Sequence, residues 1–344
     1  MFRASSLILL AFFYFALFSS TFERIKEFPR IVFFGTPDFA VASLDALIKA
    51  DFAVVGVVTA PDREAGRGLT MSQSPIKRYA VKNSLPLFQP EKLKSPDFIQ
   101  TLSVLKPDIQ VVVAYRMLPK EVWSFPLLGT FNLHASRLPQ YRGAAPINWA
   151  IINGEEETGV TTFFIDDEID TGAVLLQEGI HIRSEECAGE LHDRLKILGA
   201  GLVVKTVKRI VTGDIAPRTQ VLLSPDTDML KLAPKIRKSD TVINWNQDTH
   251  IVYNQIRGLT PSPGVYTEIE LKDGSFIRVK IGSVRVSYDS QQQTFIPGDV
   301  VSDRKRFLKI GTRDGYIEVL TLQPASKKHM NIRDFLNGSG ALLA

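Results

Sequence analysis

Two polar side chains on one short predicted strand could support acyl transfer. Asn132 and His134 stand two residues apart at the end of the apolar stretch 130–133, so on a strand they point to the same face. An amide N–H can hydrogen-bond the oxyanion of a tetrahedral intermediate, and a neighbouring imidazole can move protons. His134 could equally be a polar residue satisfied at a strand end. The functional interpretation therefore depends on what other segments bring to it.

A carboxylate from a second segment could complete this chemistry. Residues 166–170 place four carboxylates in five positions. Adjacent carboxylates on an extended chain point in alternating directions and no histidine stands at a ligand spacing, so a solvated acidic loop is the default interpretation and no metal site is predicted. Asp170, between Ile169 and a Thr-Gly turn, is the carboxylate that we expect to be held in place.

The elements that would position these groups are those of a parallel α/β sheet. The sequence predicts an apolar strand at 30–34, an amphipathic helix at 39–49 and a second strand at 54–58. This order is typical of a β-α-β unit. The turn at Gly35 has one glycine instead of the three of a dinucleotide fingerprint, which disfavours nicotinamide binding.

Two further predicted strands bring polar residues to one edge of that sheet. The stretch 109–114 is the strongest central strand of the chain, and residues 115–119 (Tyr-Arg-Met-Leu-Pro) leave its end. Ligands in open parallel sheets gather at the carboxyl ends of strands. We therefore expect residues 115–119 and the residues after Leu133 to lie together, which strengthens the functional interpretation of His134.

The connecting segments are predicted to be mostly helical. Helices are predicted at 75–83, 97–105 and 188–212, and a further helical pattern begins at Ala145. Residues 61–75 instead form a predicted loop that contains Arg63 and Arg67. A loop of this length without regular structure is uncommon in a compact domain unless it is functional or disordered.

The bulk properties indicate two domains and a charge imbalance between them. A chain of 344 residues, 44% hydrophobic and 23% charged, is long enough for about two globular domains. Residues 1–225 hold 24 Lys+Arg and 24 Asp+Glu, so the net charge of +4 arises wholly from the last third. That surplus fits either a polyanionic partner or an ordinary solvated face. Cys187 is the only cysteine, which excludes an intrachain disulfide and fits a reducing compartment.

The last third is predicted to form a small β-barrel behind a proline-containing linker. Short strands with hairpin turns are typical of such barrels. The predicted strands are 266–271, 276–286, 298–301, 307–312 and 316–322, with a helix before them at 249–257. The basic residues of this region concentrate at Arg304, Lys305, Arg306, Lys309, Arg313, Lys327 and Lys328.

The N-terminus differs from the rest of the chain. Residues 7–18 are a twelve-residue apolar run behind Arg3, too short to span a bilayer on its own. The run is similar to a signal-peptide core, but it lacks a small-x-small cleavage site and has a thin basic region. A translation start placed too far upstream is a second interpretation. We expect residues 1–26 to be a non-structural extension of a cytoplasmic protein.

With these segments assembled, the chain resembles the methionyl-tRNA branch of the formyltransferase superfamily from Arg30 to its end. Six motifs in this order and spacing carry the resemblance: Val-Phe-Phe-Gly-Thr-Pro-Asp-Phe-Ala (32–40), Pro-Asp-Arg-Glu-Ala-Gly-Arg-Gly (61–68), Asn-Leu-His-Ala-Ser-Arg-Leu-Pro (132–139), Tyr-Arg-Gly-Ala-Ala-Pro-Ile (141–147), Glu-Thr-Gly-Val-Thr (157–161) and Asp-Thr-Gly (170–172).

The resemblance implies a fold and an activity. It implies a Rossmann-like α/β catalytic domain with a mostly parallel sheet, which we place at 27–214, a linker at 215–234 and an OB-fold-like β-barrel domain at 235–344. It also implies transfer of a formyl group from 10-formyltetrahydrofolate, the co-substrate, to the α-amino group of methionine on initiator methionyl-tRNA. No metal is implied. We expect a monomer in the bacterial cytoplasm, with an organelle as the alternative.

The resemblance also implies roles for individual residues. The implied catalytic residues are Asn132, His134 and Asp170. The implied folate-binding residues are Arg116, Met117, Leu118, Ser136, Arg137, Leu138, Pro139 and Asp166. The expected tRNA contacts are Arg63, Arg67, Arg304, Lys305, Arg306 and Lys309. Arg116 and Arg137 depart from the pattern of the tRNA branch, where glycine and leucine are common.

Three other functions compete with this interpretation. The acceptor could be glycinamide ribonucleotide or an amino-sugar nucleotide, or the chain could be an inactive RNA-binding protein on the same scaffold. The glycinamide enzymes lack a C-terminal β domain, and the amino-sugar enzyme carries a dehydrogenase domain that has no counterpart here. The intact set of Asn132, His134 and Asp170 argues against an inactive protein.

Overall fold

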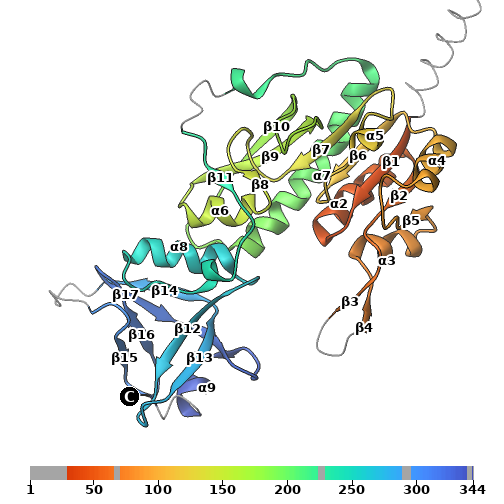
Figure 1. Cartoon of the computed structure of the whole chain (residues 1–344). Helices are drawn as coiled ribbons and strands as arrows, with labels where there is room; N and C mark the ends of the chain where they lie inside the picture. The colour runs from red at the N-terminus through yellow and green to blue at the C-terminus, as the bar shows by residue number, and fades with distance from the viewer. Residues whose placement is uncertain (1–28, 66–69, 224–228, 289–295, 339–342, 344) are drawn as a thin grey trace, which may run out of the picture. The chain divides into compact units, whose positions relative to one another are not determined.

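The computed structural model describes residues 29–65, 70–223, 229–288, 296–338 and 343 (Figure 1). The extension predicted at 1–26 lies outside these residues. Spatial contacts divide the chain into two units, each assembled from three segments. The first unit comprises Met1–Pro139, Gly159–Glu178 and Leu195–Met229, and the second comprises Gln140–Thr158, Gly179–Arg194 and Leu230–Ala344. The contiguous domain boundaries expected from the sequence stay a prediction.

A seven-stranded sheet forms the centre of the first unit. Its strand order is β10-β9-β7-β6-β1-β2-β5. The strands are β1 (Arg30–Gly35), β2 (Ala53–Val58), β5 (Leu87–Phe88), β6 (Ile109–Val113), β7 (Thr130–His134), β9 (Glu157–Phe164) and β10 (Val174–His181). The five strands from β5 to β7 are parallel, whereas β9 runs antiparallel to β7. The predicted α/β class with a mostly parallel sheet is confirmed.

The central strands are apolar on both faces because helices cover both. On one face, α7 (Ala188–Thr212) approaches the sheet so closely that a Cβ on Gly199 would lie 2.7 Å from Leu133, and the Thr206 hydroxyl lies 2.8 Å from that of Thr162. On the other, α4 (Pro96–Leu105) and α5 (Lys120–Trp123) add Phe98, Leu102 and Val122 to a core around Val112.

The remaining helices of the first unit begin where the sequence supplies start signals. In α2 (Asp38–Lys49), Asp38 adds a carboxylate to the first turn, which the helix dipole favours. Pro75 opens α3 (Pro75–Lys82), and the Ser74 side chain accepts a hydrogen bond from the N–H of Lys77. Serine at the N-cap satisfies one N–H that the helix leaves unpaired, and proline at the first helical position has no N–H that would need a partner.

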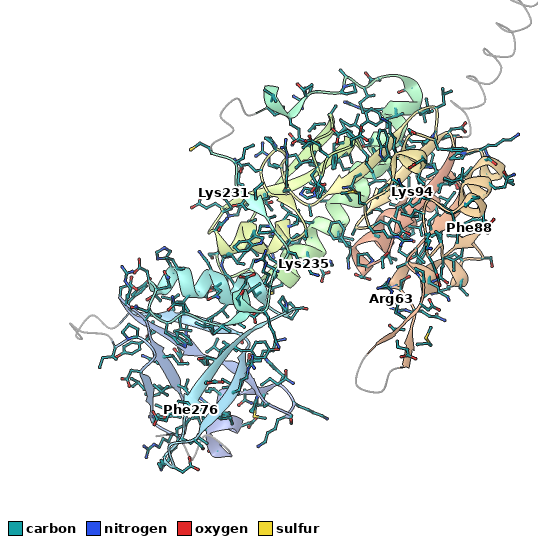
Figure 2. The ribbon with its side chains drawn as sticks, viewed as in Figure 1. Arg63, Phe88, Lys94, Lys231, Lys235 and Phe276 are labelled. Atoms are coloured by element: carbon teal, nitrogen blue, oxygen red, sulfur yellow. The ribbon has the colours of Figure 1, made fainter. Side chains whose placement is uncertain are left out.

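Residues 61–75 correct one prediction. The segment is not a loop without regular structure, because β3 (Arg63–Ala65) and β4 (Thr70–Ser72) pair as an antiparallel hairpin. The hairpin was not predicted because each of its strands has only three residues and neither shows an alternation of apolar and polar residues. Arg67 lies outside the described residues. Arg63 lies on β3, at the base of the hairpin (Figure 2).

The second unit combines the helices α6 (Pro146–Ile152), α8 (Thr249–Leu259) and α9 (Ile332–Asn337), a short parallel pair of strands and two antiparallel sheets. The parallel pair is β8 (Arg142–Gly143) with β11 (Leu232–Ala233), and α6 lies against α8. One sheet has the order β12-β13-β18-β19 and the other β14-β17-β16-β15. Their strands are β12 (Val265–Glu270), β13 (Phe276–Ile281), β14 (Val284–Ser287), β15 (Val300–Ser302), β16 (Leu308–Gly311), β17 (Tyr316–Val319), β18 (Thr321–Pro324) and β19 (Met330–Asn331).

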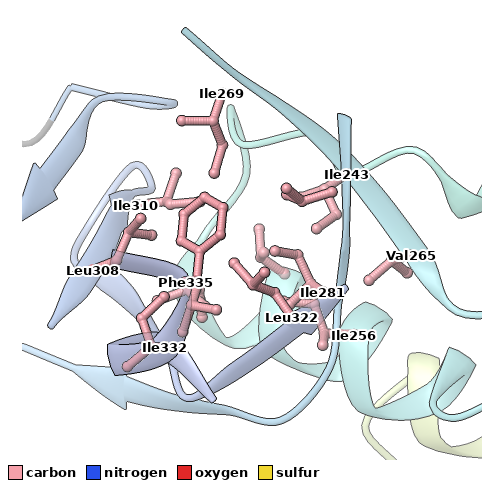
Figure 3. Close-up of a cluster of buried hydrophobic side chains, with 14 of the residues drawn as sticks. Ile243, Ile256, Val265, Ile269, Ile281, Leu308, Ile310, Leu322, Ile332 and Phe335 are labelled. Carbon is pink, nitrogen blue, oxygen red and sulfur yellow. The ribbon is translucent and has the colours of Figure 1, made fainter. Parts of the chain in front are cut away.

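One apolar core lies inside these two sheets. Alternate residues of the strands, such as Val279 and Ile281 on β13, point inward beside Ile256 of α8 and Phe335 of α9 (Ile332–Asn337) (Figure 3). A small antiparallel β domain was predicted and is confirmed. Two predicted strands are wrong in detail, because 276–286 divides at Gly282–Ser283 and 316–322 divides at Leu320. Each break lets the chain leave one sheet and join the other.

Candidate functional site

Strand β7 places Asn132 and His134 on the same face of the sheet. Asn132 lies opposite Val112 of β6 and Phe163 of β9, and His134 lies opposite Thr161 of β9. Val112 belongs to the core covered by α4 and α5, so the two polar side chains project from that face. Asn132 is half-buried and His134 is only 6% exposed.

Asp170 is the carboxylate that the structure brings to the histidine. The Nδ1 atom of His134 lies 3.7 Å from Oδ2 of Asp170, with side-chain exposures of 7% and 14%. This distance allows an ion pair when the imidazole is protonated. The two residues are 36 positions apart in sequence, and the fold alone unites them. The predicted neighbourhood of His134 and Asp170 is confirmed.

The loop that carries Asp170 approaches by an unexpected route. Because β9 runs antiparallel to β7, its last residue, Phe164, pairs with Phe131 near the start of β7. The loop therefore does not leave the carboxyl edge where the residues after β6 and β7 emerge. Asp170 reaches His134 from the other direction, with a backbone φ of +57°, a left-handed conformation that aspartate tolerates better than most residues.

Contacts within and beside this loop fix its shape. The Oδ1 atom of Asp166 accepts hydrogen bonds from the N–H of Glu168 at 3.1 Å and the hydroxyl of Thr171 at 2.9 Å. A Cβ on Gly172 would lie 1.7 Å from the carbonyl oxygen of Phe164, so only glycine fits there. Asp166, predicted to bind folate, thus caps its own loop, and its side chain is exposed.

The turn after β7 is held by the side chains of Thr161 and Gln177, for which the sequence predicted no individual role. The hydroxyl of Thr161 donates to the carbonyl of Ser136 at 2.6 Å and accepts from the N–H of Leu138 at 3.1 Å. The Gln177 amide donates to the carbonyl of Leu138 at 2.7 Å. Ser136 and Leu138 are buried, whereas Arg137, which lies between them in the sequence, is exposed.

The segment after β6 divides its predicted folate-binding side chains among three environments. Leu118 is 5% exposed and packs in the core, so only its backbone remains for a ligand. The guanidinium of Arg116 donates to the carbonyls of Glu91 at 2.8 Å and Pro90 at 2.5 Å. Met117 is 67% exposed. Of the three, Met117 offers the most free apolar surface.

Three of the expected nucleic-acid contacts of the second unit lie on the turn between β15 and β16, and the fourth, Lys309, lies on β16. Arg304, Lys305 and Arg306 are exposed, and Asp303 organises the turn by accepting hydrogen bonds from the N–H groups of Lys305 and Arg306. The backbone N–H and guanidinium of Arg306 hold the pKa of the Asp303 carboxyl well below its usual range. The Lys309 ammonium makes cation–π contacts with Phe307 and Tyr316. Its Nζ atom lies 5.8 Å and 6.0 Å from the two ring centroids.

An anchor at the base of the β3–β4 hairpin is a further feature that sequence reasoning missed. The Lys77 ammonium donates to Oδ2 of Asp62 at 2.5 Å, and the Gln89 amide donates to Oδ1 at 2.9 Å. These hydrogen bonds, that of Lys77 first, lower the pKa of the Asp62 carboxyl. The anchor joins Asp62, which precedes the hairpin, to Lys77 and Gln89, which follow it. No local sequence pattern predicts these contacts.

The arrangement of Asn132, His134 and Asp170 supports acyl transfer to an amine. A half-buried amide can hydrogen-bond a developing oxyanion, a buried imidazole can move a proton, and a carboxylate at ion-pair distance can favour the protonated imidazole. Among the residues that the structure describes, no group of three His, Cys, Asp or Glu side chains could hold a metal ion. Over the same residues, no helix is long and apolar enough to cross a membrane.

Comparison with protein families gives two matches that together account for most of the chain. The family model described as formyl transferase matches residues 29–207, and the model of the formyl transferase C-terminal domain matches residues 235–340. Both of the regions assigned from the sequence, the α/β part and the β-rich part, are thereby covered.

Curated relatives are similar over nearly their whole length. The methionyl-tRNA formyltransferase of Azobacteroides pseudotrichonymphae genomovar. CFP2 is 51% identical over 316 residues, which cover 92% of this chain and 97% of the relative. That of Bacteroides fragilis (strain YCH46) is 47% identical over 319 residues, covering 91% and 96%.

Solved structures share the fold at low sequence identity. The sugar 3N-formyl transferase WlaRD, crystallised with dTDP and 5-N-formyl-THF, has a TM-score of 0.61 at 19% identity and covers 87% of this chain and 99% of its own. An N-formyltransferase from Helicobacter canadensis, in complex with folinic acid and dTDP-3-aminofucose, has a TM-score of 0.59 at 20% identity, with coverages of 85% and 98%.

Proposed function

This chain belongs to the formyl transferase family, and we propose that it formylates the α-amino group of methionine on initiator methionyl-tRNA. The formyl donor is 10-formyltetrahydrofolate, and the products are N-formylmethionyl-tRNA and tetrahydrofolate. The observation that carries the chemistry is the 3.7 Å approach of Asp170 to His134, two residues along the strand from Asn132. The identity of 51% to a curated methionyl-tRNA formyltransferase supports the choice of acceptor.

Asn132 acts on the oxygen of the formyl group. The lone pair of the amine attacks the formyl carbon, and the carbonyl π electrons move to oxygen to give an oxyanion. The side-chain N–H of Asn132 hydrogen-bonds this oxyanion more strongly than the neutral carbonyl, so it lowers the barrier. Loss of one such donor typically costs about 10²–10³ in rate.

His134 moves the proton that the reaction must transfer. The attacking amine becomes an ammonium in the tetrahedral intermediate, and the N10 atom of the folate must accept a proton as the bond between carbon and N10 breaks. His134 takes the first proton and delivers the second, so the imidazole is unchanged at the end. Asp170, within ion-pair distance, stabilises the intermediate imidazolium.

Three surfaces around this centre support a folate site. Ser136 to Pro139 form a turn held by Thr161 and Gln177, Met117 presents exposed apolar surface, and residues 166–170 form a capped loop. A flat, partly apolar ring with polar edges is the kind of ligand that such a mixture of apolar and backbone groups accommodates. Arg137 is exposed, and its positive charge would attract the carboxylates of the folate glutamate.

The tRNA contacts divide between the two units. The hairpin with Arg63 and Arg67 contacts the acceptor end, and the turn residues 304–306, together with Lys309 on β16, attract the phosphate backbone. Arg63 and the three turn residues 304–306 are exposed, which supports this assignment. Contacts to phosphate contribute affinity that falls with salt and carry no sequence information.

A parallel transfer assay tests the acceptor. The enzyme is supplied with 10-formyltetrahydrofolate and with initiator methionyl-tRNA, glycinamide ribonucleotide or a dTDP-amino sugar, and uncharged initiator tRNA serves as the control. We expect formylation of the charged tRNA alone. Transfer confined to either small acceptor would refute the proposed function.

The cellular setting follows from the same assignment. Initiator methionyl-tRNA is available where translation begins, so the enzyme acts in the bacterial cytoplasm, without stable membrane association. Cys187, the only cysteine of the sequence, suits a reducing compartment. The monomeric state stays a prediction, which light scattering of the purified protein would check.

A further inference from the structure

One buried side chain outside the proposed catalytic residues forms hydrogen bonds with the backbone of the loop that carries Asp170. Gln220 is 3% exposed, and its side-chain amide donates hydrogen bonds to the carbonyl oxygens of Asp170 at 2.8 Å and of Gly172 at 3.0 Å. Both protons of one NH₂ group are thus used on carbonyls two residues apart. The bonds link positions 50 and 48 residues distant in sequence.

The backbone that Gln220 grips is unusual in two ways. Asp170 has a backbone φ of +57°. Residues other than glycine rarely adopt this conformation, so surrounding contacts must maintain it. Two residues later, Gly172 lies against the Phe164 carbonyl with no space for a Cβ. Gln220 therefore closes the loop on one side while the strand closes it on the other.

The segment that presents Gln220 is itself fixed to the first unit. The backbone of Arg218 exchanges two hydrogen bonds with that of Val174, at 2.8 and 2.9 Å. Leu223, three residues after Gln220, packs against the buried cluster of Leu138, Phe163 and Val174. Residues 218–223 lie within the predicted linker 215–234, yet these contacts place them beside the loop that carries Asp170.

We infer that Gln220 is a positioning residue that holds Asp170 against His134. The inference rests on the proposed function, because the distance between Asp170 and His134 matters only if His134 transfers the proton. Without the two hydrogen bonds, the loop can relax from its left-handed conformation and the carboxylate moves away from Nδ1. A misplacement of about 1 Å caused by a change remote from the chemistry can cost about 10²-fold in rate.

The first test replaces the amide while keeping the size of the side chain. Gln220→Met removes both donors, and we expect kcat to fall about 10- to 100-fold with KM for folate and tRNA within about twofold. Thr219→Ala, at the exposed neighbouring position, is the matched control and should behave as wild type. An unchanged kcat in Gln220→Met would overturn the inference.

A double-mutant cycle separates positioning from general stability. If Gln220 acts through Asp170, then Gln220→Met should lower the rate of an Asp170→Asn enzyme by less than about threefold, since coupled residues are non-additive. A full additional loss would show that Gln220 acts elsewhere. Gln220→Asn, which retains an amide on a shorter side chain, should recover part of the lost kcat and serves where the methionine variant folds poorly.

Hydrogen exchange tests the grip without reference to activity. Backbone amides of residues 166–173 should exchange faster in Gln220→Met than in wild type, whereas those of β1 and β6 should not change. Equal exchange in the loop contradicts the inference. Failure of the proposed function would appear differently, as a wild-type enzyme that does not formylate initiator methionyl-tRNA.

Discussion

The catalytic centre and the basic turn of the C-terminal β domain are built on opposite principles. The pair of His134 and Asp170 joins residues from separate segments, with side chains 7% and 14% exposed. The turn at 303–306 is local in sequence, and the side chain of Arg306 is 77% exposed. One group of residues depends on the whole fold for its geometry, and the other depends on a single hairpin.

This difference separates what mutations in each region should change. At the proposed catalytic centre, a displaced atom should change transition-state stabilisation and therefore kcat. On the turn, an exposed cation acts through a screened field, so its loss changes affinity and salt dependence while leaving the chemistry intact. Four predictions test this contrast, in order of decreasing effect.

The largest effect is expected at His134. His134→Ala removes the group that moves the proton, and we expect kcat to fall about 10²–10⁴-fold with unchanged affinity for tRNA. Single-turnover formylation and a separate binding titration measure the two quantities. His192→Ala, on the partly exposed face of α7, is the control. A variant with near wild-type turnover would remove His134 from the mechanism.

Gly172 comes next, because it tests the loop without touching a reacting group. In Gly172→Ala the new Cβ would meet the Phe164 carbonyl at 1.7 Å, so the loop must shift. We expect kcat to fall about 10²-fold and the free energy of unfolding to drop by about 1–3 kcal/mol. Gly201→Ala, with no atom within 4 Å of the added methyl group, should retain both. Wild-type kinetics at Gly172→Ala would mean that the loop position is irrelevant.

The hairpin anchor should give an intermediate effect. Lys77→Met removes the ammonium bound to Asp62, and we expect kcat/KM for initiator tRNA to fall about tenfold, equivalent to about 1.4 kcal/mol of transition-state stabilisation. KM for the folate donor should not change. Lys82→Met, exposed on the same helix, is the control, and equal values for the two variants would exclude the anchor from tRNA recognition.

The sign of the pH dependence of this anchor follows from Asp62. Its carboxyl pKa is lowered from 3.8, chiefly by the hydrogen bond from Lys77. The contribution of the anchor is therefore complete above pH 3.8 and is lost only as the pH falls through the lowered pKa. Between pH 6 and 8, the ratio of wild-type to Lys77→Met kcat/KM should be constant.

The smallest effects are expected on the basic turn. Lys305→Ala should lower the slope of log K against log salt by about 0.7–0.9, the loss of one phosphate contact. Arg306→Ala should change it less, because Asp303 already shares the charge of that guanidinium. Binding at several salt concentrations measures the slopes, with Lys49→Ala, an exposed lysine of α2 for which no tRNA contact is proposed, as the control. A large fall in kcat in either variant would erase the contrast between the regions.

The sequence predicted the elements whose signal is local and repeated. The apolar strands β1, β2 and β6 and the 25-residue helix α7 follow from patterns within their own segments. The face shared by Asn132 and His134 also follows, because a strand has a period of two. Elements without such a pattern were missed, including the eight-residue strand β10 and the short helices α5 and α9.

The parts of the site that the sequence did not reveal depend on contacts between distant segments. Gln220 looked like a linker residue because its function is to bond carbonyls 48 and 50 positions away. Thr161 and Gln177 support the turn after β7 in the same way. Side chains that hold a backbone need only an amide or a hydroxyl, and such groups carry no distinctive spacing.

The interleaving of the two units has a consequence for how the chain is made. Helix α6 packs on α8, with the Asn148 amide donating to the carbonyl of Gly258, 110 residues later, and with Ile152 beside the same glycine. During synthesis, α6 therefore leaves the ribosome long before α8 has been made. The apolar side of α6 stays exposed while the sheet of the first unit assembles. A chain released before α8 has been made would therefore leave the side of α6 that contacts α8 exposed to solvent.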